Sequence, residues 1–415
     1  MNALDSIHPV PAAWLRDSVL TPFVPAYWRS LVEQHYSVAT ARQYLCGVAH
    51  FARWMRRGGL AVCDLEDDVV RRFLDEHLPR CACPSPVQRC RHQVRAALRH
   101  MLALIENSGT LTKSHAPNAV EDELRRYDEY MRHARGLAEN TRVQRLHILR
   151  AFLQKNCGSN SRGLTSPTPD DLRRFITLQL QRWSPASANV LAGALRSYLR
   201  FKAVCGDQVG HLLPVITSPA NWRLATLPQT LSRNQVAQLL DSFSPDLPSV
   251  LRAYAMVRCV VDLGLRASEV VSLGLDDIDW LSGTLRIVKN KSRRVDVLPL
   301  PQATGSAIAK YLRSERPQTA NRRVFVRHVA PVDKPIGPSV VRQAVCEAYL
   351  RCGLPYTRVH ILRHTLASRL LDTGGTLKEV ADVLRHRQLD TSLIYAKVDT
   401  ARLSAVALPW PGSAS

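Results

Sequence analysis

The stretch 360–395 constrains the fold of this chain more than any other part of the sequence. Leucines recur at helical spacing over residues 362–371, and two consecutive glycines then interrupt the pattern. Thr376, followed three residues later by Glu379, predicts the capped start of a second helix. Residues 390–392 offer N-cap side chains for a third helix. We therefore expect three short helices joined by tight breaks.

Four polar side chains lie at short, fixed intervals within this stretch. His360 and Arg363 are three residues apart, so they share one face of the first predicted helix. His386 follows the second helix, and Tyr395 lies on the third. The helix breaks should therefore bring two imidazoles, a guanidinium and a phenol together, in a cluster suited to an anion.

The charge balance predicts a polyanionic partner. The 415-residue chain has 56 Lys and Arg against 35 Asp and Glu, which gives a formal net charge of +21. Because phosphate contacts dominate nucleic-acid affinity, this excess favours a nucleic-acid partner over charge that serves solubility alone. The length predicts two or three domains, and an apolar fraction of 46% allows each domain to bury a core.

The sequence predicts neither an export signal nor a membrane segment. Residues 1–15 lack a basic segment followed by an apolar core, and no apolar run reaches the roughly 18 residues of a membrane span. Ten cysteines without such a signal predict reduced, mostly buried thiols in a cytoplasm.

The first half of the chain contains two similar helical patterns, over residues 20–107 and 118–205. Matching segments follow one another in the same order, and Thr40 and Thr141 open equivalent helices. Apolar residues recur in both at i, i+3, i+4 and i+7, which predicts two amphipathic helical bundles. We favour a duplication, or at least an equivalent architecture, over chance similarity between short helical patterns.

A group of cysteines and histidines lies within the first bundle. It contains Cys81, Cys83, Cys90 and His92, with His77 just upstream. Thiolates and imidazoles are zinc ligands, but this spacing is not one of the common zinc patterns. A zinc site at Cys81, Cys83, Cys90 and His92 is therefore one interpretation, and free cysteines in a proline-containing loop are the favoured one.

A linker and a domain of mixed structure are expected after the second bundle. Residues 213–228 contain prolines and no helical or strand period. Residues 278–288 and 295–300 have strand patterns on either side of a polar tip. Before them, the sequence Gly-Leu-Arg-Ala-Ser-Glu at residues 264–269 ends one helix and begins another. Alone, its Arg and Glu would indicate an exposed ion pair.

Together, these motifs closely resemble the tyrosine recombinase (phage integrase) family. The resemblance rests on the 264–269 motif with Arg266, on His360 and Arg363, on His386 and on Tyr395, and it covers roughly residues 118–400. It implies a mainly α fold with a small antiparallel β-sheet in the catalytic domain, preceded by helical DNA-binding bundles. The implied division is an additional N-terminal helical, SAM-like domain (1–117), a core-binding helical domain (118–212), the linker (213–228), the catalytic domain (229–409) and a tail (410–415).

The resemblance also implies a role for each residue of the motifs. Tyr395 would attack a DNA phosphate and form a 3′-phosphotyrosyl intermediate without metal or ATP. Arg266 and Arg363 would clamp the phosphate oxygens. His360 and His386 would donate hydrogen bonds to the phosphate, with His360 also positioned as a base for the phenol.

A lysine at the tip of the hairpin would protonate the leaving 5′ oxygen. Counting back from Pro299 selects Lys291, whereas counting forward from Arg266 falls between Lys289 and Lys291. We prefer Lys291, with Lys289 in a supporting position. Glu269 would orient a cation or an imidazole of the site.

One position departs from the family pattern, which usually has glycine where this chain has Arg385. Glycine permits left-handed backbone, so the conformation of the turn that holds His386 stays open. Arg385 and Arg387 are expected to add cations beside the DNA.

The resemblance implies a site-specific recombinase or integrase of a mobile element, acting in integration, excision or transposition. Its partner would be double-stranded DNA, bound by a homo-tetramer on two sites or by a hetero-assembly of related recombinases. It would need no cofactor and no membrane, and would associate with the nucleoid of a prokaryotic cytoplasm. A type IB topoisomerase is a close alternative, although the doubled bundle and the short catalytic domain favour a recombinase. A non-catalytic DNA-binding accessory protein is another, and the complete residue set argues against it.

Overall fold

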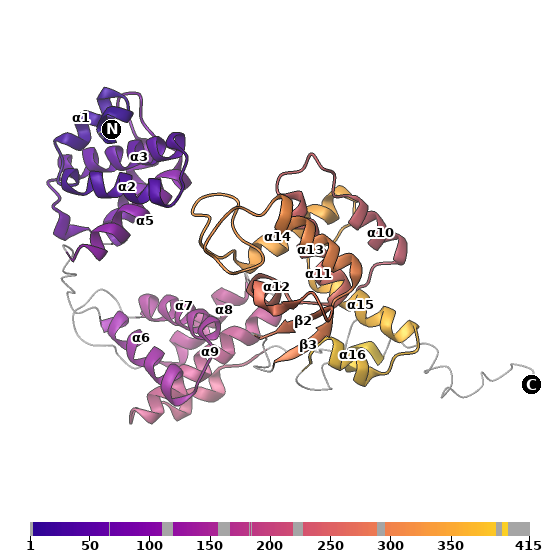
Figure 1. Cartoon of the computed structure of the whole chain (residues 1–415). Helices are drawn as coiled ribbons and strands as arrows, with labels where there is room; N and C mark the ends of the chain where they lie inside the picture. The colour runs from indigo at the N-terminus through magenta and orange to yellow at the C-terminus, as the bar shows by residue number, and fades with distance from the viewer. Residues whose placement is uncertain are drawn as a thin grey trace, which may run out of the picture. The chain divides into compact units, whose positions relative to one another are not determined.

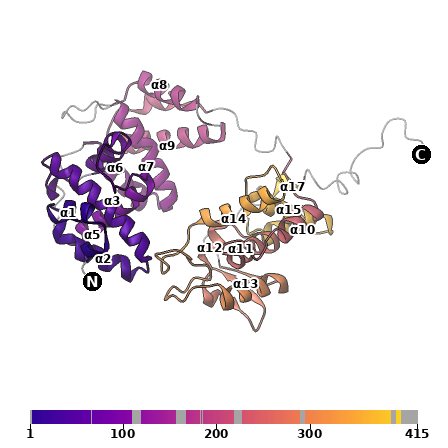
Figure 2. The same ribbon diagram turned by 90° about the horizontal axis from the view of Figure 1, so that it is seen from above.

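The computed structural model describes residues 3–65, 67–109, 119–156, 167–181, 183, 185–218, 227–288, 295–386 and 392–396. The backbone divides into two compact units, Lys113–Ala225 and the remainder of the chain (Figures 1 and 2). Within the larger unit, buried apolar side chains form separate clusters in residues 3–105 and 231–362. The structure is mainly α-helical with a small antiparallel sheet, as predicted. No helix among these residues is long and apolar enough to cross a bilayer.

The N-terminal bundle is built around α3 and α5. Ser37 caps α3, because its Oγ accepts a hydrogen bond from the amide of Thr40 at 3.2 Å. The α3 face that includes Leu45 and Phe51 is buried against α1 and α5. Its elements are α1 (Pro9–Arg16), α2 (Val24–Glu33), α3 (Val38–Arg57), α4 (Asp67–Arg72), a π-helical turn (Phe73–His77), a 3-10 turn (Leu78–Arg80) and α5 (Arg91–Asn107).

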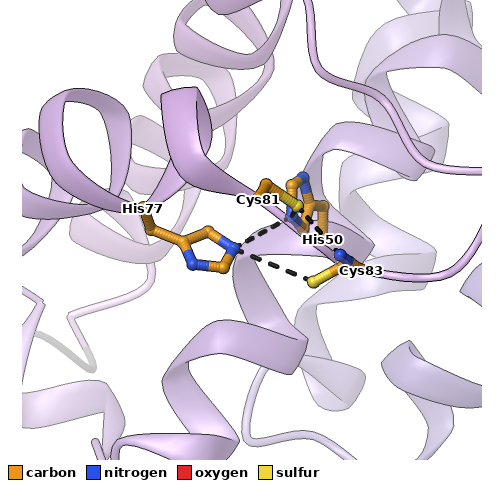
Figure 3. Close-up of side chains that lie close together, drawn as sticks. All are labelled: His50, His77, Cys81 and Cys83. Atoms are coloured by element: carbon orange, nitrogen blue, oxygen red, sulfur yellow. Dashed lines mark hydrogen bonds between the residues drawn. The ribbon is translucent and has the colours of Figure 1, made fainter.

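The cysteines of this bundle are grouped differently from the predicted zinc set. Cys81 and Cys83 face His77 and, from α3, His50 (Figure 3). The other two predicted ligands form an exposed pair of their own, with Cys90 Sγ 3.1 Å from His92 Nδ1. The expectation of mostly buried thiols was also wrong, because among the described cysteines only Cys83 and Cys259 are buried.

The second bundle lies within residues 119–216. Its elements are α6 (Ala119–Glu129), a π-helical turn (Tyr130–Ala134), α7 (Glu139–Asn156), α8 (Pro169–Leu180), α9 (Pro185–Val204) and a 3-10 turn (Gly210–Val215). The 3-10 turn and Ile216 pack into the core of this bundle, so the predicted linker, 213–228, begins too early. The predicted duplication stays a prediction.

The remaining residues form helices around a three-stranded sheet. The strands β1 (Ile278–Asp279), β2 (Thr284–Ile287) and β3 (Asp296–Pro299) are antiparallel in the order β1-β2-β3, and Leu285 pairs with Leu298. The helix α11 lies among α12, α13 and α14 (Figure 2) and also contacts α15. Half of its residues are buried in the core. The helices are α10 (Arg233–Asp241), α11 (Val250–Leu263), α12 (Ala267–Ser272), α13 (Gln302–Ser314), α14 (Pro338–Arg351), α15 (His360–Asp372), α16 (Leu377–Val383) and α17 (Leu393–Ala396).

Gly264 ends α11 in left-handed backbone, with φ +58°, and turns the chain into α12. A Cβ at this position would lie 2.8 Å from Leu384 Cδ2 and 2.9 Å from Leu366 Cδ2. The helix end therefore depends on glycine for its conformation and for the close approach of these leucines.

We expect Gly264→Ala to destabilise the protein by about 2 kcal/mol, as measured by thermal unfolding. About 1 kcal/mol comes from the left-handed conformation and the rest from displacing packed leucine ends. Gly283→Ala is the matched control, because Gly283 has φ +62° and a Cβ there would meet nothing within 4 Å. Equal losses in both variants would contradict the role assigned to the leucine contacts.

Candidate active site

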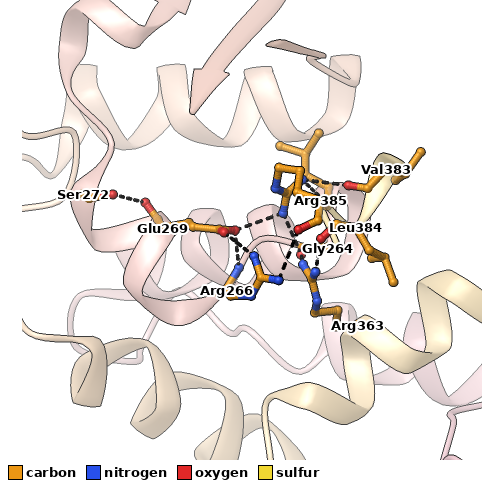
Figure 4. A network of polar contacts seen from close by, with 9 residues as sticks. Gly264, Arg266, Glu269, Ser272, Arg363, Val383, Leu384 and Arg385 are labelled. Atoms are coloured by element: carbon orange, nitrogen blue, oxygen red, sulfur yellow. Dashed lines mark hydrogen bonds and ion pairs between the residues drawn. The ribbon is translucent and has the colours of Figure 1, made fainter. Parts of the chain in front are cut away.

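Arg363 connects three segments that are distant in the sequence. From α15, its Nη1 donates to the Gly264 carbonyl at the end of α11, and its Nη2 donates to the Leu384 carbonyl after α16 (Figure 4). The residue is 5% exposed. Burial, together with the nearby guanidiniums of Arg266 and Arg385, lowers the pKa of Arg363 to about 9, so it stays protonated at neutral pH.

Glu269 holds two further guanidiniums beside Arg363. Its Oε1 accepts from Arg266 Nη1 at 2.6 Å, and its Oε2 accepts from Arg385 Nη2 at 2.9 Å (Figure 4). Burial would raise the pKa of Glu269, but the charges of Arg385 and Arg266 and the Arg266 amide outweigh it, so the pKa is lowered. The ionised carboxylate therefore contacts both guanidiniums, and its orienting role stays a prediction.

Arg385 belongs to this network and not to the surface. Its side chain is 1% exposed and donates to the carbonyls of Val383 at 2.8 Å and Gly264 at 3.1 Å. The expectation that Arg385 is a cation beside the DNA is therefore wrong, and Arg387 lies outside the described residues. Arg385 has φ +54°, so it adopts the left-handed conformation that glycine would permit.

Tyr395 lies on α17 with its phenol directed at histidines. The residue is 2% exposed, and its Oη lies 2.8 Å from His364 Nδ1. The His386 ring is parallel to the phenol ring within 4°, with centroids 6.4 Å apart. His386 is itself held by Ser392, whose Oγ lies 2.7 Å from its Nδ1. Burial, opposed by the charge of Arg363, raises the pKa of Tyr395 to about 12.

The imidazoles around Tyr395 are neutral at pH 7. Burial is the largest cause and lowers the pKa of both His364 and His386 to about 4. His360 and Arg363 lower the pKa of His364 further. Arg363 and Arg266 do the same for His386. Burial, followed by Arg363 and Arg266, also lowers the pKa of His360. A neutral His364 can accept the phenol proton at Nδ1 when its other nitrogen carries the hydrogen.

The structure brings most of the predicted site residues together. Arg266 and Glu269 form an ion pair, and His386 stacks beside Tyr395. The positive charge of Arg363 acts on the pKa of His360, His386 and Tyr395, which places Arg363 near all three. Lys289 and Lys291 lie outside the described residues. The prediction passed over His364, although its position four residues after His360 placed it on the same helix face.

Comparison with known proteins gives matches over most of the chain. The profile of the phage integrase family matches residues 229–402, and that of the phage integrase N-terminal SAM-like domain matches residues 124–204. A candidate integrase/recombinase of Sinorhizobium fredii, y4rA, is 36% identical over 401 residues, which is 95% of this chain and 94% of the relative. The tyrosine recombinase XerD of Rhizobium meliloti is 29% identical, over 66% of this chain and 90% of the relative.

Solved structures share the fold over about two thirds of the chain. The Tn1549 transposon integrase, in complex with transposon right-end DNA, has a TM-score of 0.50 at 16% identity, over 68% of this chain and 99% of that one. A lambda integrase dimer bound to a core site has a TM-score of 0.51 at 15% identity, over 71% and 99%. With the full-length relative at 36% identity, these matches lead to one conclusion: the chain belongs to the phage integrase family and is a tyrosine site-specific recombinase.

Proposed function

We propose that this recombinase cuts and rejoins double-stranded DNA through a 3′-phosphotyrosyl bond at Tyr395. The observation that carries the proposal is the Tyr395 phenol, held against His364 at 2.8 Å beside His386 and the arginine network. A phenol can displace a DNA strand and store the bond energy in a phosphodiester, so rejoining needs no ATP.

The proposed reaction needs no reactant besides the protein and the DNA. Tyr395 Oη attacks the scissile phosphorus as its proton passes to a neutral imidazole, for which His364 Nδ1 is placed best. Arg266 and Arg363 stabilise the extra negative charge of the five-coordinate phosphorane. The 5′ oxygen leaves with a proton from a tip lysine. A 5′ hydroxyl of the other DNA then attacks the phosphotyrosine, which reverses these transfers and joins the strands.

The imidazole that takes the phenol proton can be identified by comparing two variants. We expect His364→Ala to slow single-turnover cleavage by about 10²-fold or more, because general base catalysis is worth that much. His360→Ala should slow cleavage less, since His360 contributes a hydrogen bond to the phosphate. Cleavage is measured on a nicked suicide substrate at several pH values. Normal cleavage by His364→Ala, with a large loss in His360→Ala, would restore the original assignment of the base to His360.

We propose Lys291, with Lys289 in support, as the source of the proton for the leaving oxygen. Lys291→Ala should slow cleavage of ordinary DNA by about 10²-fold or more. DNA with sulfur in place of the 5′ bridging oxygen should restore it, because a thiolate leaves without a proton. Lys289→Ala is the matched control. Rescue of Lys289→Ala by sulfur, and not of Lys291→Ala, would exchange the two assignments.

We propose that four copies assemble on two DNA sites at the ends of a mobile element in a bacterial nucleoid. The solved relatives are bound to a transposon end or to a core site, and the net charge of +21 fits a DNA partner. We propose that residues 118–212 bind the core site in the DNA and that residues 229–409 carry out catalysis. Residues 1–117 would bind accessory DNA or a neighbouring subunit.

An exchange assay on the DNA flanking this gene tests the function. Two labelled element-end fragments should yield recombinant products, and light scattering of the stalled complex should give four chains on two DNA molecules. Removing residues 1–117 should leave the footprint over the core site and delete any outer footprint. Relaxation of supercoiled DNA without any strand exchange would contradict the proposal and favour a topoisomerase.

A further inference from the structure

Four potential metal ligands meet within the N-terminal bundle. His50 comes from α3, His77 ends the π-helical turn, and Cys81 and Cys83 lie on the loop that follows (Figure 3). One ligand atom from each residue lies within 4.8 Å of all the others. His50 is fully buried and Cys83 is 5% exposed. His77 and Cys81 are half-buried, so all four ligand groups are at least partly shielded from water.

The separations between these atoms fit a tetrahedral metal site. His50 Nε2 lies 3.2 Å from His77 Nε2 and 3.1 Å from Cys81 Sγ. Cys83 Sγ lies 3.8 Å from His77 Nε2. With zinc–nitrogen bonds of about 2.1 Å and zinc–sulfur bonds of about 2.3 Å, the corners of a tetrahedron are about 3.4–3.8 Å apart. Three of the six separations therefore lie within about 0.5 Å of tetrahedral values, and all six are at most 4.8 Å.

The surrounding hydrogen bonds orient the ligands as a metal would require. His50 Nδ1 lies 3.0 Å from the Gln88 carbonyl, so it carries the hydrogen and leaves the Nε2 lone pair directed at the cluster. The Cys83 amide donates to Cys81 Sγ at 3.3 Å, which holds that sulfur beside the cluster. Arg89 Nη2 donates to the Cys83 carbonyl at 3.1 Å and fixes the loop.

We propose that His50, His77, Cys81 and Cys83 bind one zinc ion in each chain. Two thiolates balance the charge of Zn²⁺, and the set of two sulfurs and two nitrogens is one that zinc prefers over magnesium or calcium. Four protein ligands close the coordination sphere, so the ion is structural.

The proposed ion would connect the loop between His77 and α5 to the central helix α3. Around it, the His50 and His77 rings pack on Phe73 at centroid distances of 5.2 and 5.3 Å. The loop between His77 and α5 has no strand and no α-helix of its own. Because a metal bound only by the folded bundle stabilises it, zinc should set the thermal stability of this part of the protein.

The test measures zinc in the full-length protein purified with zinc-supplemented medium and then exchanged into metal-free buffer. We expect one zinc per chain by mass spectrometry of the metals. Cys81→Ser with Cys83→Ser should lower the content about tenfold or more, and so should His50→Asn with His77→Asn. Cys90→Ser with His92→Asn is the matched control, because it removes a neighbouring exposed Cys–His pair at 3.1 Å. The control should keep its zinc.

Three measurements on the unaltered protein keep the test valid if a variant fails to fold. Zinc should be released in step with the blocking of two thiols by a mercurial. Cobalt(II) added to the metal-free protein should give the visible bands of a tetrahedral thiolate site. Removing zinc with a strong chelator should lower the first unfolding transition by about 10 °C, and zinc should restore it. Less than a tenth of a zinc per chain, zinc lost in the buffer exchange, or equal loss in the control would overturn the proposal.

Discussion

Tyr395→Phe should abolish covalent attachment to DNA and leave the fold intact. The change removes only the hydroxyl, which is the proposed nucleophile, and keeps the buried ring packed beside His386. Removing a nucleophile that forms a covalent intermediate lowers the rate by about 10⁴-fold or more. Losing the hydrogen bond to His364 should change the stability by only about 1 kcal/mol. Single-turnover cleavage of a suicide substrate and thermal unfolding measure the two effects.

Tyr349→Phe is the matched control for this experiment. Tyr349 is also fully buried in the same part of the chain, and its hydroxyl donates to a backbone carbonyl, that of Arg358, at 3.4 Å. This variant should cleave DNA at the normal rate. Adduct formation by Tyr395→Phe at more than about a hundredth of the normal rate would require another nucleophile and would contradict the assignment.

Glu269→Ala should destabilise the catalytic part of the protein by about 3–5 kcal/mol. The substitution leaves the guanidiniums of Arg266 and Arg385 without their buried counter-charge, and breaking such a pair costs that much. Burial opposes ionisation, but the guanidiniums lower the pKa of Glu269 below its ordinary value of 4.5. Its stabilisation is therefore complete above about pH 4.5 and is lost as the pH falls through the lowered pKa.

The stability of this variant is measured by calorimetry of the full chain. Asp276→Ala is the control, because the Asp276–Arg322 ion pair is exposed on both sides, at 68% and 70%. The Asp276→Ala variant should lose no more than about 0.5 kcal/mol of stability. Glu269→Gln should fall between the two, since an amide keeps one acceptor but not the charge. Equal stability of the Glu269 and Asp276 variants would show that the buried network does not hold the site together.

Features set by residues three or four positions apart could be predicted from the sequence. Thr376 and Glu379 form the expected capping box, with the Thr376 amide 2.6 Å from the Glu379 carboxylate. Gly264 ends α11 as its position predicted. The antiparallel strands also follow the predicted pattern around the tip. The capping box and the conformation at Gly264 are decided within one helical turn, and the paired strands are close together in the sequence.

Features that depend on contacts between distant segments could not be predicted from the sequence. The contact of His364 with Tyr395 depends on how α15 and α17 pack, and the family resemblance had given the role of base to His360. Arg385 resembled a surface cation, because the carboxylate that receives it is 116 residues away. The grouping of His50 with Cys81 and Cys83 was missed for the same reason, since α3 precedes the cysteine loop.

The most direct measurement of the central claim is the chemical identity of the residue joined to DNA. The protein is trapped on a suicide substrate, the DNA is digested to a single nucleotide, and the peptides from trypsin are sequenced by mass spectrometry. The peptide 388–397 contains Tyr395 as its only tyrosine. It should carry the nucleotide through a 3′-phosphate on that side chain. A nucleotide on any other residue, or a 5′-phosphate linkage, would contradict the account.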